Sequence, residues 1–129
     1  MFDPATLINQ TLEYLRQDCP CPIYTAFPEE DFVLFGTAIL TIPDWTQTNP
    51  PLDDYTANIQ LEIYTNLQAD RDGRFIDALQ VYFFNKLQQI TPQSESFPDI
   101  VGVLPMTGKQ EDSDPLRCRT LILPVVLSF

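Results

Sequence analysis

The sequence predicts an α+β domain, in which a mostly antiparallel sheet of four to five strands carries two helices packed on one face. Residues 55–63 alternate apolar and polar side chains, a period of two that is typical of a strand with one buried face. Residues 76–90 place apolar side chains three and four positions apart, which is typical of a helix with one buried stripe. Loops separate most of the strand candidates, and this favours antiparallel pairing.

The length and composition of the chain predict a single domain over residues 1–129. A chain of 129 residues with 44% hydrophobic residues can bury one core. No apolar run approaches the roughly 20 residues that cross a bilayer, and the first residues lack the basic and apolar regions of a secretion signal. We therefore expect a soluble protein, made in the cytoplasm, with no membrane partner.

The first helix should begin at Pro4 and run to about Gln17. Asp3 is a good N-cap, and a proline at the first helical position loses no hydrogen bond. The prolines within residues 18–22 end the helix, because a proline cannot continue it.

Two strand candidates follow this helix. Residues 23–27 can form an edge strand or a loop brace, and residues 32–42 are rich in β-branched and aromatic side chains, which predicts a largely buried strand. Gly36 within this second strand indicates a bulge or a close backbone approach.

Residues 43–53 combine prolines with polar side chains, so we expect a projecting loop between two paired strands rather than regular structure. Trp45 is its most informative residue, because a tryptophan in a loop is costly to leave in water. Either it folds back as a lid on the sheet, or it anchors a protein interface, where tryptophan is enriched.

The joint between the predicted strand at 55–63 and the helix at 76–90 contains Asp70, Asp72 and Gly73. These residues resemble part of a calcium loop, but that register would place Leu79 where a bidentate glutamate is required. We predict instead that Asp70 and Asp72 cap the second helix and that Gly73 eases the turn.

The last third of the chain predicts two strands and a loop. Residues 91–92 (Thr-Pro) end the second helix, and residues 100–104 form a short strand candidate. Residues 105–115 are polar and predict a second loop. Residues 117–129 alternate again and predict a closing strand, which should lie at an edge or carry a bulge at Pro124 because proline cannot donate to a ladder.

The residue types needed for most catalytic sites are missing or scattered. The chain has no histidine, so it lacks the commonest general base. Acidic pairs such as those within residues 29–31 and at Asp53 and Asp54 are better explained as solvated loops than as a glycosidase pair. The four glycines are isolated from one another, which argues against a phosphate loop. We expect no enzyme activity and no cofactor.

Three cysteines, Cys19, Cys21 and Cys118, cannot all pair within one molecule, so free thiols in a reducing compartment are the simpler interpretation. A zinc site would need more soft ligands than these, and a rigid proline turn explains Cys19 and Cys21 better. We therefore expect no bound metal.

The formal charge is −11, and the 7 Lys and Arg residues are scattered. Such a surface repels phosphate rather than gathering it. Specific binding of nucleic acid is therefore not expected.

In its organisation the chain resembles the tail terminator, or tail completion, proteins of tailed bacteriophages. The resemblance extends over nearly the whole chain. It is carried by the opening helix (residues 4–17), the strand at 32–42 with its loop, the segment 55–66 (YTANIQLEIYTN) with the helix through residues 77–82 (DALQVY), and the closing strand to Phe129.

The resemblance implies a virion protein of the tail or neck without enzymatic activity. Such proteins form six-membered rings on the head-proximal end of the tail tube, where they stop tube polymerisation and join the tail to the neck. The implied partners are further copies in a homohexamer, the tail tube protein, and a stopper or connector protein. Genome DNA would pass through the lumen without specific binding, and an acidic chain suits such a lumen.

The family has no fingerprint from which a site residue can be transferred, so the interface candidates come from loop length and composition. They are Asp44, Trp45, Asp53, Asp54, Lys109, Glu111, Asp112 and Asp114.

Three alternatives remain open. The proline-flanked cysteines and the extra acidic loop near Glu111 leave room for another neck protein, such as a stopper or adaptor. A small non-viral protein-binding module could use the Trp45 loop to hold another protein. The missing histidine argues against the third alternative, a small enzyme using Asp53 and Asp54.

Overall fold

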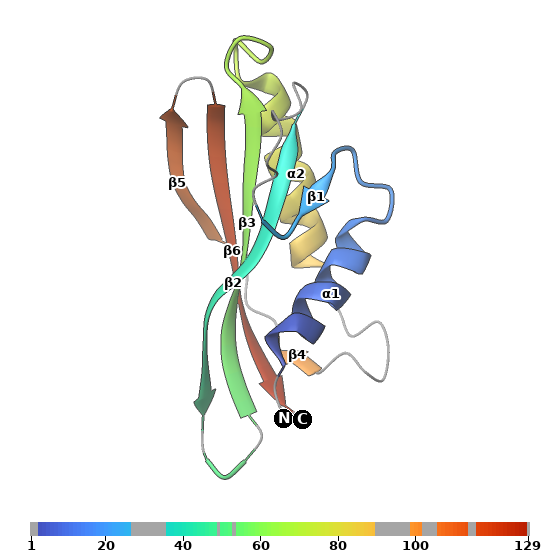
Figure 1. The fold of residues 1–129 in the computed structure, drawn as a ribbon, viewed down its shortest axis with the longest axis vertical. Coiled ribbons are helices and arrows are strands. Elements are labelled where there is room, and N and C mark those ends of the chain that lie inside the picture. The colour runs from blue at the N-terminus through green and yellow to red at the C-terminus, as the bar shows by residue number, and fades with distance from the viewer. Residues whose placement is uncertain are drawn as a thin grey trace.

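The computed structural model of the chain describes residues 3–26, 36–48, 50–52, 54–89, 99–101, 106–113 and 116–128. Within them, two helices lie on one side of a six-stranded sheet (Figure 1). The elements in chain order are α1 (Pro4–Leu15), β1 (Ile23–Tyr24), β2 (Thr37–Thr48), β3 (Asp54–Asn66), α2 (Arg74–Gln88), β4 (Asp99–Val101), β5 (Met106–Ser113) and β6 (Leu116–Ser128).

The α+β class with a mostly antiparallel sheet is confirmed. The strand order is β1-β2-β3-β6-β4, with β5 also paired to β6, and the β1–β2 pair is parallel while the others are antiparallel. Four strands, β2, β3, β5 and β6, have eight residues or more. The short strands β1 and β4, of 2 and 3 residues, raise the count above the expected four to five.

The core lies between the sheet and the two helices. The odd-numbered residues of β3 face the same side as their partners on β6, for example Ile59 opposite Leu123 and Leu61 opposite Leu121. All four of these side chains are buried. The predicted stripe of α2 is buried with them in one cluster, comprising Ile76, Leu79, Phe83 and Leu87. The period-two and helical patterns therefore identified the faces that meet.

The boundaries of several elements differ from the predictions. Helix α1 ends at Leu15 rather than Gln17. The candidate at 23–27 is the two-residue edge strand β1. Residues 32–35 and the predicted helix stop at 91–92 lie outside the described residues, as does Ile90. The close approach expected at Gly36 is present, because a Cβ there would meet the side chains of Leu79 and Phe75.

The prediction of a loop at residues 43–53 is wrong for residues 43–48, because β2 continues as far as Thr48. The ladder with β3 shifts register between Thr41 and Asp44 and then resumes through Thr48 opposite Asp54. Pro43 falls within this irregularity, where a missing N–H is tolerated. The strand persists because β3 supplies hydrogen-bond partners that the composition of residues 44–48 does not reveal.

The prediction of a polar loop at residues 105–115 is also wrong for residues 106–113, which form β5 and pair with β6. Polar residues are common on edge strands, where composition is a weak guide to pairing. The closing strand β6 was expected at an edge or with a bulge at Pro124, but it is interior and pairs continuously with β3. On its other side, β6 pairs with β4 as far as Val126 and with β5 as far as Ile122. Pro124 lies between these two paired segments.

The joint before α2 has the predicted capping. The Asp70 carboxylate accepts the backbone N–H groups of Phe75 and Ile76, each at 3.0 Å. Asp72 accepts the N–H of Arg74 at 3.3 Å, and Gly73 adopts a left-handed φ of 72°. No helix in the described part of the chain is long and apolar enough to span a membrane.

Candidate protein-interaction surfaces

The β2–β3 hairpin ends in a segment that we call the arm, the described residues 44–48, 50–52 and 54–58. Its strands pair from Asp44 opposite Asn58 to Thr48 opposite Asp54. The arm reaches beyond both helices, at the lower end of the molecule in Figure 1. The side chain of Gln47 donates from Nε2 to the carbonyl oxygen of Leu52 at 3.0 Å, which orders the turn. The arm is therefore a hydrogen-bonded projection rather than an irregular loop.

Apolar side chains on the arm are exposed to solvent. Trp45 is 46% exposed, and its ring lies 6.0 Å from the ring of Tyr55 at an interplanar angle of 60°. Tyr55 is buried, whereas Leu52 at the turn is 59% exposed. Trp45 thus packs partly on Tyr55, while its exposed part leaves the role of interface anchor as a prediction. Exposed apolar side chains gathered on a projection are typical of an interaction site.

The opposite face of the arm is polar. Successive side chains of a strand point to opposite faces, so Asp44 lies across the sheet from Trp45. Asn58 donates from Nδ2 to Oδ1 of Asp44 at 2.7 Å, joining β2 to β3. These two residues line a concavity of about 170 Å³ together with Thr46, Thr56, Ala57, Pro124, Val125 and Val126. This surface offers hydrogen-bonding groups beside the apolar side chains of β6.

The structure separates the predicted interface residues into two groups. Asp44 and Trp45 lie on the arm, and Asp54 begins β3 opposite Ser128 of β6. Lys109, Glu111 and Asp112 belong to β5, whose Glu111 pairs with Cys118 near the other end of β6. Asp53, Asp114 and the acidic residues 29–31 lie outside the described residues. The two groups therefore occupy opposite ends of β6, and the described parts do not form one site.

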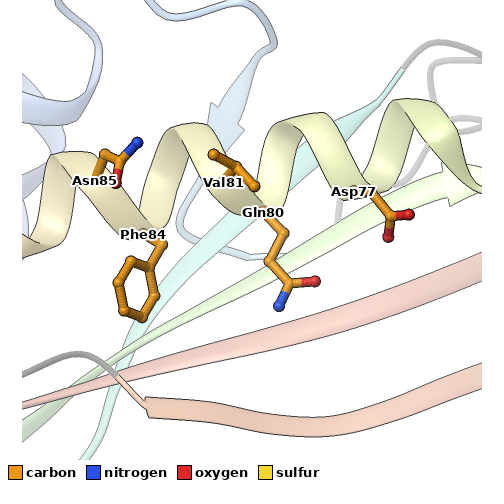
Figure 2. Close-up of a pocket in the computed structure, with 5 residues that line it drawn as sticks. All are labelled: Asp77, Gln80, Val81, Phe84 and Asn85. Atoms are coloured by element: carbon orange, nitrogen blue, oxygen red, sulfur yellow. The ribbon is translucent and has the colours of Figure 1, made fainter.

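Helix α2 carries a second surface that the sequence did not reveal. A groove of about 290 Å³ lies beside this helix, and the described residues that line it are Asp77, Gln80, Val81, Phe84 and Asn85 (Figure 2). Val81 is 60% exposed, whereas Phe84 is partly buried against the core. The sequence signal was present, because Val81 and Phe84 are apolar yet lie off the stripe that explains the core face of α2. The core stripe alone predicts the helix, so the helical periodicity does not single out these two residues.

The turn after α1 brings two thiols together. The Cys19 sulfur lies 3.0 Å from the carbonyl oxygen of Cys21, and Cys21 is buried. A hydrogen bond from the Cys21 thiol lowers the pKa of Cys19 to about 7, with Lys86 and Arg16 also favouring the thiolate. The same hydrogen bond and burial raise the pKa of Cys21. Cys118 lies on β6 opposite Tyr64, and the described residues contain no group of three His, Cys, Asp or Glu that could hold a metal.

The arm and the α2 groove share a simple chemistry. Each combines exposed apolar side chains with carboxylate or amide groups, which suits burial against another protein surface. The chain matches no known protein-family model, and no curated protein matches its sequence. Function must therefore be inferred from these surfaces together with the organisation of the chain.

Proposed function

We propose that this chain is a structural protein of the phage neck. It forms a ring that caps the head-proximal end of the tail tube, stops tube polymerisation and joins the tail to the head-side connector. It acts by binding and not by catalysis. The observation that carries the proposal is the projecting arm with Trp45 and Leu52 exposed at 46% and 59%, because such a projection suits contact with a neighbouring subunit or with the tube.

The open edges of the sheet support assembly. Strand β1 pairs with β2 only at Ala38 and Ile39, so on that side no described strand continues along the rest of β2. Strand β5 pairs with β6 and lies at the other side of the sheet. Open edges can pair with another chain. In the part of the chain that the structure describes, the two sides of the sheet thus end in different strand edges, and this suits head-to-tail addition of copies, which closes into a ring when the rotation permits.

The charge of the chain is compatible with a ring around DNA. A net charge of −11 gives the protein little attraction for phosphate, so DNA could slide through without being held. The same charge makes copies repel one another. Salt should therefore favour self-association, since at 0.1 M exposed charges more than about 10 Å apart are largely screened from one another.

The test is to image and weigh the purified protein alone and with tail tubes of the same phage. Electron microscopy should show a ring at one end of each tube, and native mass spectrometry should show six copies. Tubes carrying the ring should no longer extend when tube protein is added. A chain that stays monomeric and never associates with tube ends overturns the proposal.

A stopper or adaptor is separated from a terminator by the same assay. A ring that binds the head-side connector but leaves tube growth unchanged identifies one of these neighbouring neck proteins. A monomer that uses Trp45 to bind some other protein would favour a non-viral binding module.

A further inference from the structure

The turn between α1 and β1 contains two cysteines that are separated by one proline, in the order Cys19, Pro20, Cys21. Residues two apart have Cα atoms no more than about 7 Å apart even in an extended chain, and this chain bends at Pro20 and Cys21. A disulfide can join residues whose Cα atoms are up to about 7 Å apart. The backbone of the turn therefore permits a bond between the two sulfurs.

The two thiols are in contact. The Cys19 sulfur lies 3.0 Å from the carbonyl oxygen of Cys21, and the Cys21 thiol hydrogen-bonds to the Cys19 sulfur. Both thiols are free, and Cys19 is half-buried whereas Cys21 is buried. A small solute thus reaches Cys19 first, and any product that forms on the Cys19 sulfur has a second thiol beside it.

Hydrogen bonds hold the backbone of this turn in place. The Tyr82 hydroxyl of α2 donates to the carbonyl oxygens of Gln17 and Asp18, at 3.3 and 3.2 Å. Arg16 donates from Nη2 to the carbonyl oxygen of Ile23 at 2.8 Å, which joins the two ends of the segment that contains both cysteines. The folded chain therefore keeps the two thiols next to each other.

The surroundings of Cys19 favour its thiolate. The hydrogen bond from the Cys21 thiol outweighs the effect of burial and lowers the pKa of Cys19 to about 7, and the positive charges of Lys86 and Arg16 act in the same direction. The thiolate is the form that attacks an oxidant. An accessible thiol of low pKa beside a second cysteine is typical of redox-reactive pairs. These features suit Cys19 for the first attack and Cys21 for the second.

Cys118 cannot replace Cys21 as the second thiol within one molecule. Leu121 and Leu123 of β6 belong to the core cluster, as does Cys21. Successive side chains of a strand point to opposite faces of the sheet, and β6 pairs with β3 without a register shift. Cys118 therefore points to the face opposite Leu121, and the sheet separates it from the Cys19–Cys21 pair.

We propose that Cys19 and Cys21 form a peroxide-reactive pair, which hydrogen peroxide converts to a reversible disulfide within one chain. The pair is a modification site in the α1–β1 turn. It is independent of the proposed ring, since none of its residues belongs to the arm.

The reaction takes place in two steps. The Cys19 thiolate attacks one oxygen of the peroxide, the O–O bond breaks, and the leaving hydroxide takes up the former Cys19 proton as water, so Cys19 becomes a sulfenic acid. The Cys21 sulfur then attacks the Cys19 sulfur, the S–O bond breaks, and the hydroxide leaves with the Cys21 proton as a second water. Two thiols are oxidised by two electrons in total, and one peroxide is reduced to two waters.

The first test treats the unaltered protein with one equivalent of hydrogen peroxide at neutral pH. Mass spectrometry without a reducing agent should show a monomer that has lost two hydrogen atoms. Iodoacetamide should then label Cys118 but neither Cys19 nor Cys21, and dithiothreitol should restore labelling of both. A gain of oxygen on Cys19 while Cys21 stays a free thiol overturns the proposal, as does a disulfide between two chains.

Three alanine variants test the role of each thiol. Cys21→Ala should accumulate a sulfenic acid on Cys19, which dimedone traps and the unaltered protein does not retain. Cys19→Ala should slow the oxidation of Cys21 by about tenfold or more, because Cys21 is buried and its pKa is raised. Cys118→Ala is the matched control and should form the disulfide at the unaltered rate.

Thermal unfolding will verify that each variant folds, and the unaltered protein decides the main question even if Cys21→Ala does not. Failure of Cys118→Ala to form the disulfide overturns the assignment of the pair. Equal oxidation of Cys21 with and without Cys19 contradicts the role of Cys19 as the nucleophile.

Discussion

The Asp70 carboxylate accepts the backbone N–H of Ile76 through Oδ2 at 3.0 Å, and this bond joins the turn that follows β3 to the first turn of α2. The same carboxylate accepts the N–H of Phe75 and the hydroxyl of Thr65, while Arg117 donates from Nε to the Asp70 carbonyl oxygen at 2.9 Å. Asp70 is 5% exposed, so these groups have little access to water. The side chain of Asp70 thus connects β3 to α2, and its backbone carbonyl connects the same turn to β6.

Asp70→Asn should lower the free energy of unfolding by about 1–3 kcal/mol. The amide group that replaces one carboxylate oxygen cannot accept, so at least one buried donor loses its partner. Urea denaturation at neutral pH will measure the loss as a lower midpoint with an unchanged slope. Asp72→Asn is the matched control. In the described contacts Asp72 accepts only from Arg74, and both side chains are largely exposed. Asp72→Asn should therefore lower the free energy of unfolding by no more than about 0.5 kcal/mol. Equal losses in the two variants would contradict the assigned role of Asp70.

The pH dependence of stability should also depend on Asp70. Burial works to raise the pKa of this carboxyl, but the hydrogen bonds from Phe75, Ile76 and Thr65, together with Arg117, hold its pKa below the ordinary value. A pKa lower in the folded than in the unfolded chain stabilises above the unfolded pKa, and this stability is lost as pH falls through the folded pKa. The loss should therefore begin near the unfolded value of about 4 and continue below it.

Urea midpoints measured from neutral pH downward will test this. The unaltered protein should lose stability more steeply below about pH 4 than Asp70→Asn, which lacks this titration. Parallel curves for the two proteins would assign the acid sensitivity to other carboxylates.

Gly36 should be intolerant of even a methyl group. Its φ is +120°, and an added Cβ would lie 2.8 Å from Leu79 Cδ1 and 3.0 Å from Phe75 Cε1. Gly36→Ala should cost about 1–3 kcal/mol from backbone strain, with the side-chain overlap adding to it. Gly73→Ala is the control, because its φ is +72° but its nearest contact is an ordinary 3.8 Å to Arg117, so about 1 kcal/mol is expected. A smaller loss for Gly36→Ala than for Gly73→Ala would contradict the close packing of α2 on this turn.

Cys19 should react with iodoacetamide ahead of Cys21. Its pKa is about 7, chiefly because the Cys21 thiol hydrogen-bonds to it, whereas Cys21 is buried and its pKa is raised. Mass spectrometry of digested samples should show that the labelling rate of Cys19 rises through about pH 7. Cys21→Ala should move that midpoint upward by removing the hydrogen bond. A midpoint for the unaltered protein near the ordinary thiol value of about 8.5 would contradict this account.

Hydrophobic periodicity predicts much of the fold. The two segments that it does not predict, residues 44–48 and 106–113, share one cause. The strand at 55–63 and the helix at 76–90 were predicted because their own side chains record which face is buried. The composition of residues 44–48 and 106–113 predicts loops, because these residues are mostly polar or follow a proline. They are strands because β3 and β6 offer them backbone partners, and a ladder depends on those partners more than on the side chains of the paired strand.

The candidate surfaces were predicted in part. Asp44 and Trp45 were chosen from composition and do lie on the projecting arm, although on strand rather than loop. The core stripe of α2 is complete without Val81 and Phe84, so its periodicity does not identify them as surface candidates. Lys109, Glu111 and Asp112 lie on β5, at the other end of β6 from the arm.

The sequence by itself determined the α+β class, the two helices and the buried faces of β3 and α2, because hydrophobic periods of two and of three to four are local records of burial. Only the tertiary structure decided how far β2 extends, that β5 exists, that Trp45 rests on Tyr55, and that Val81 borders a groove. These features depend on residues distant in the chain, since strand pairing and exposure are set by whatever neighbours the fold brings alongside.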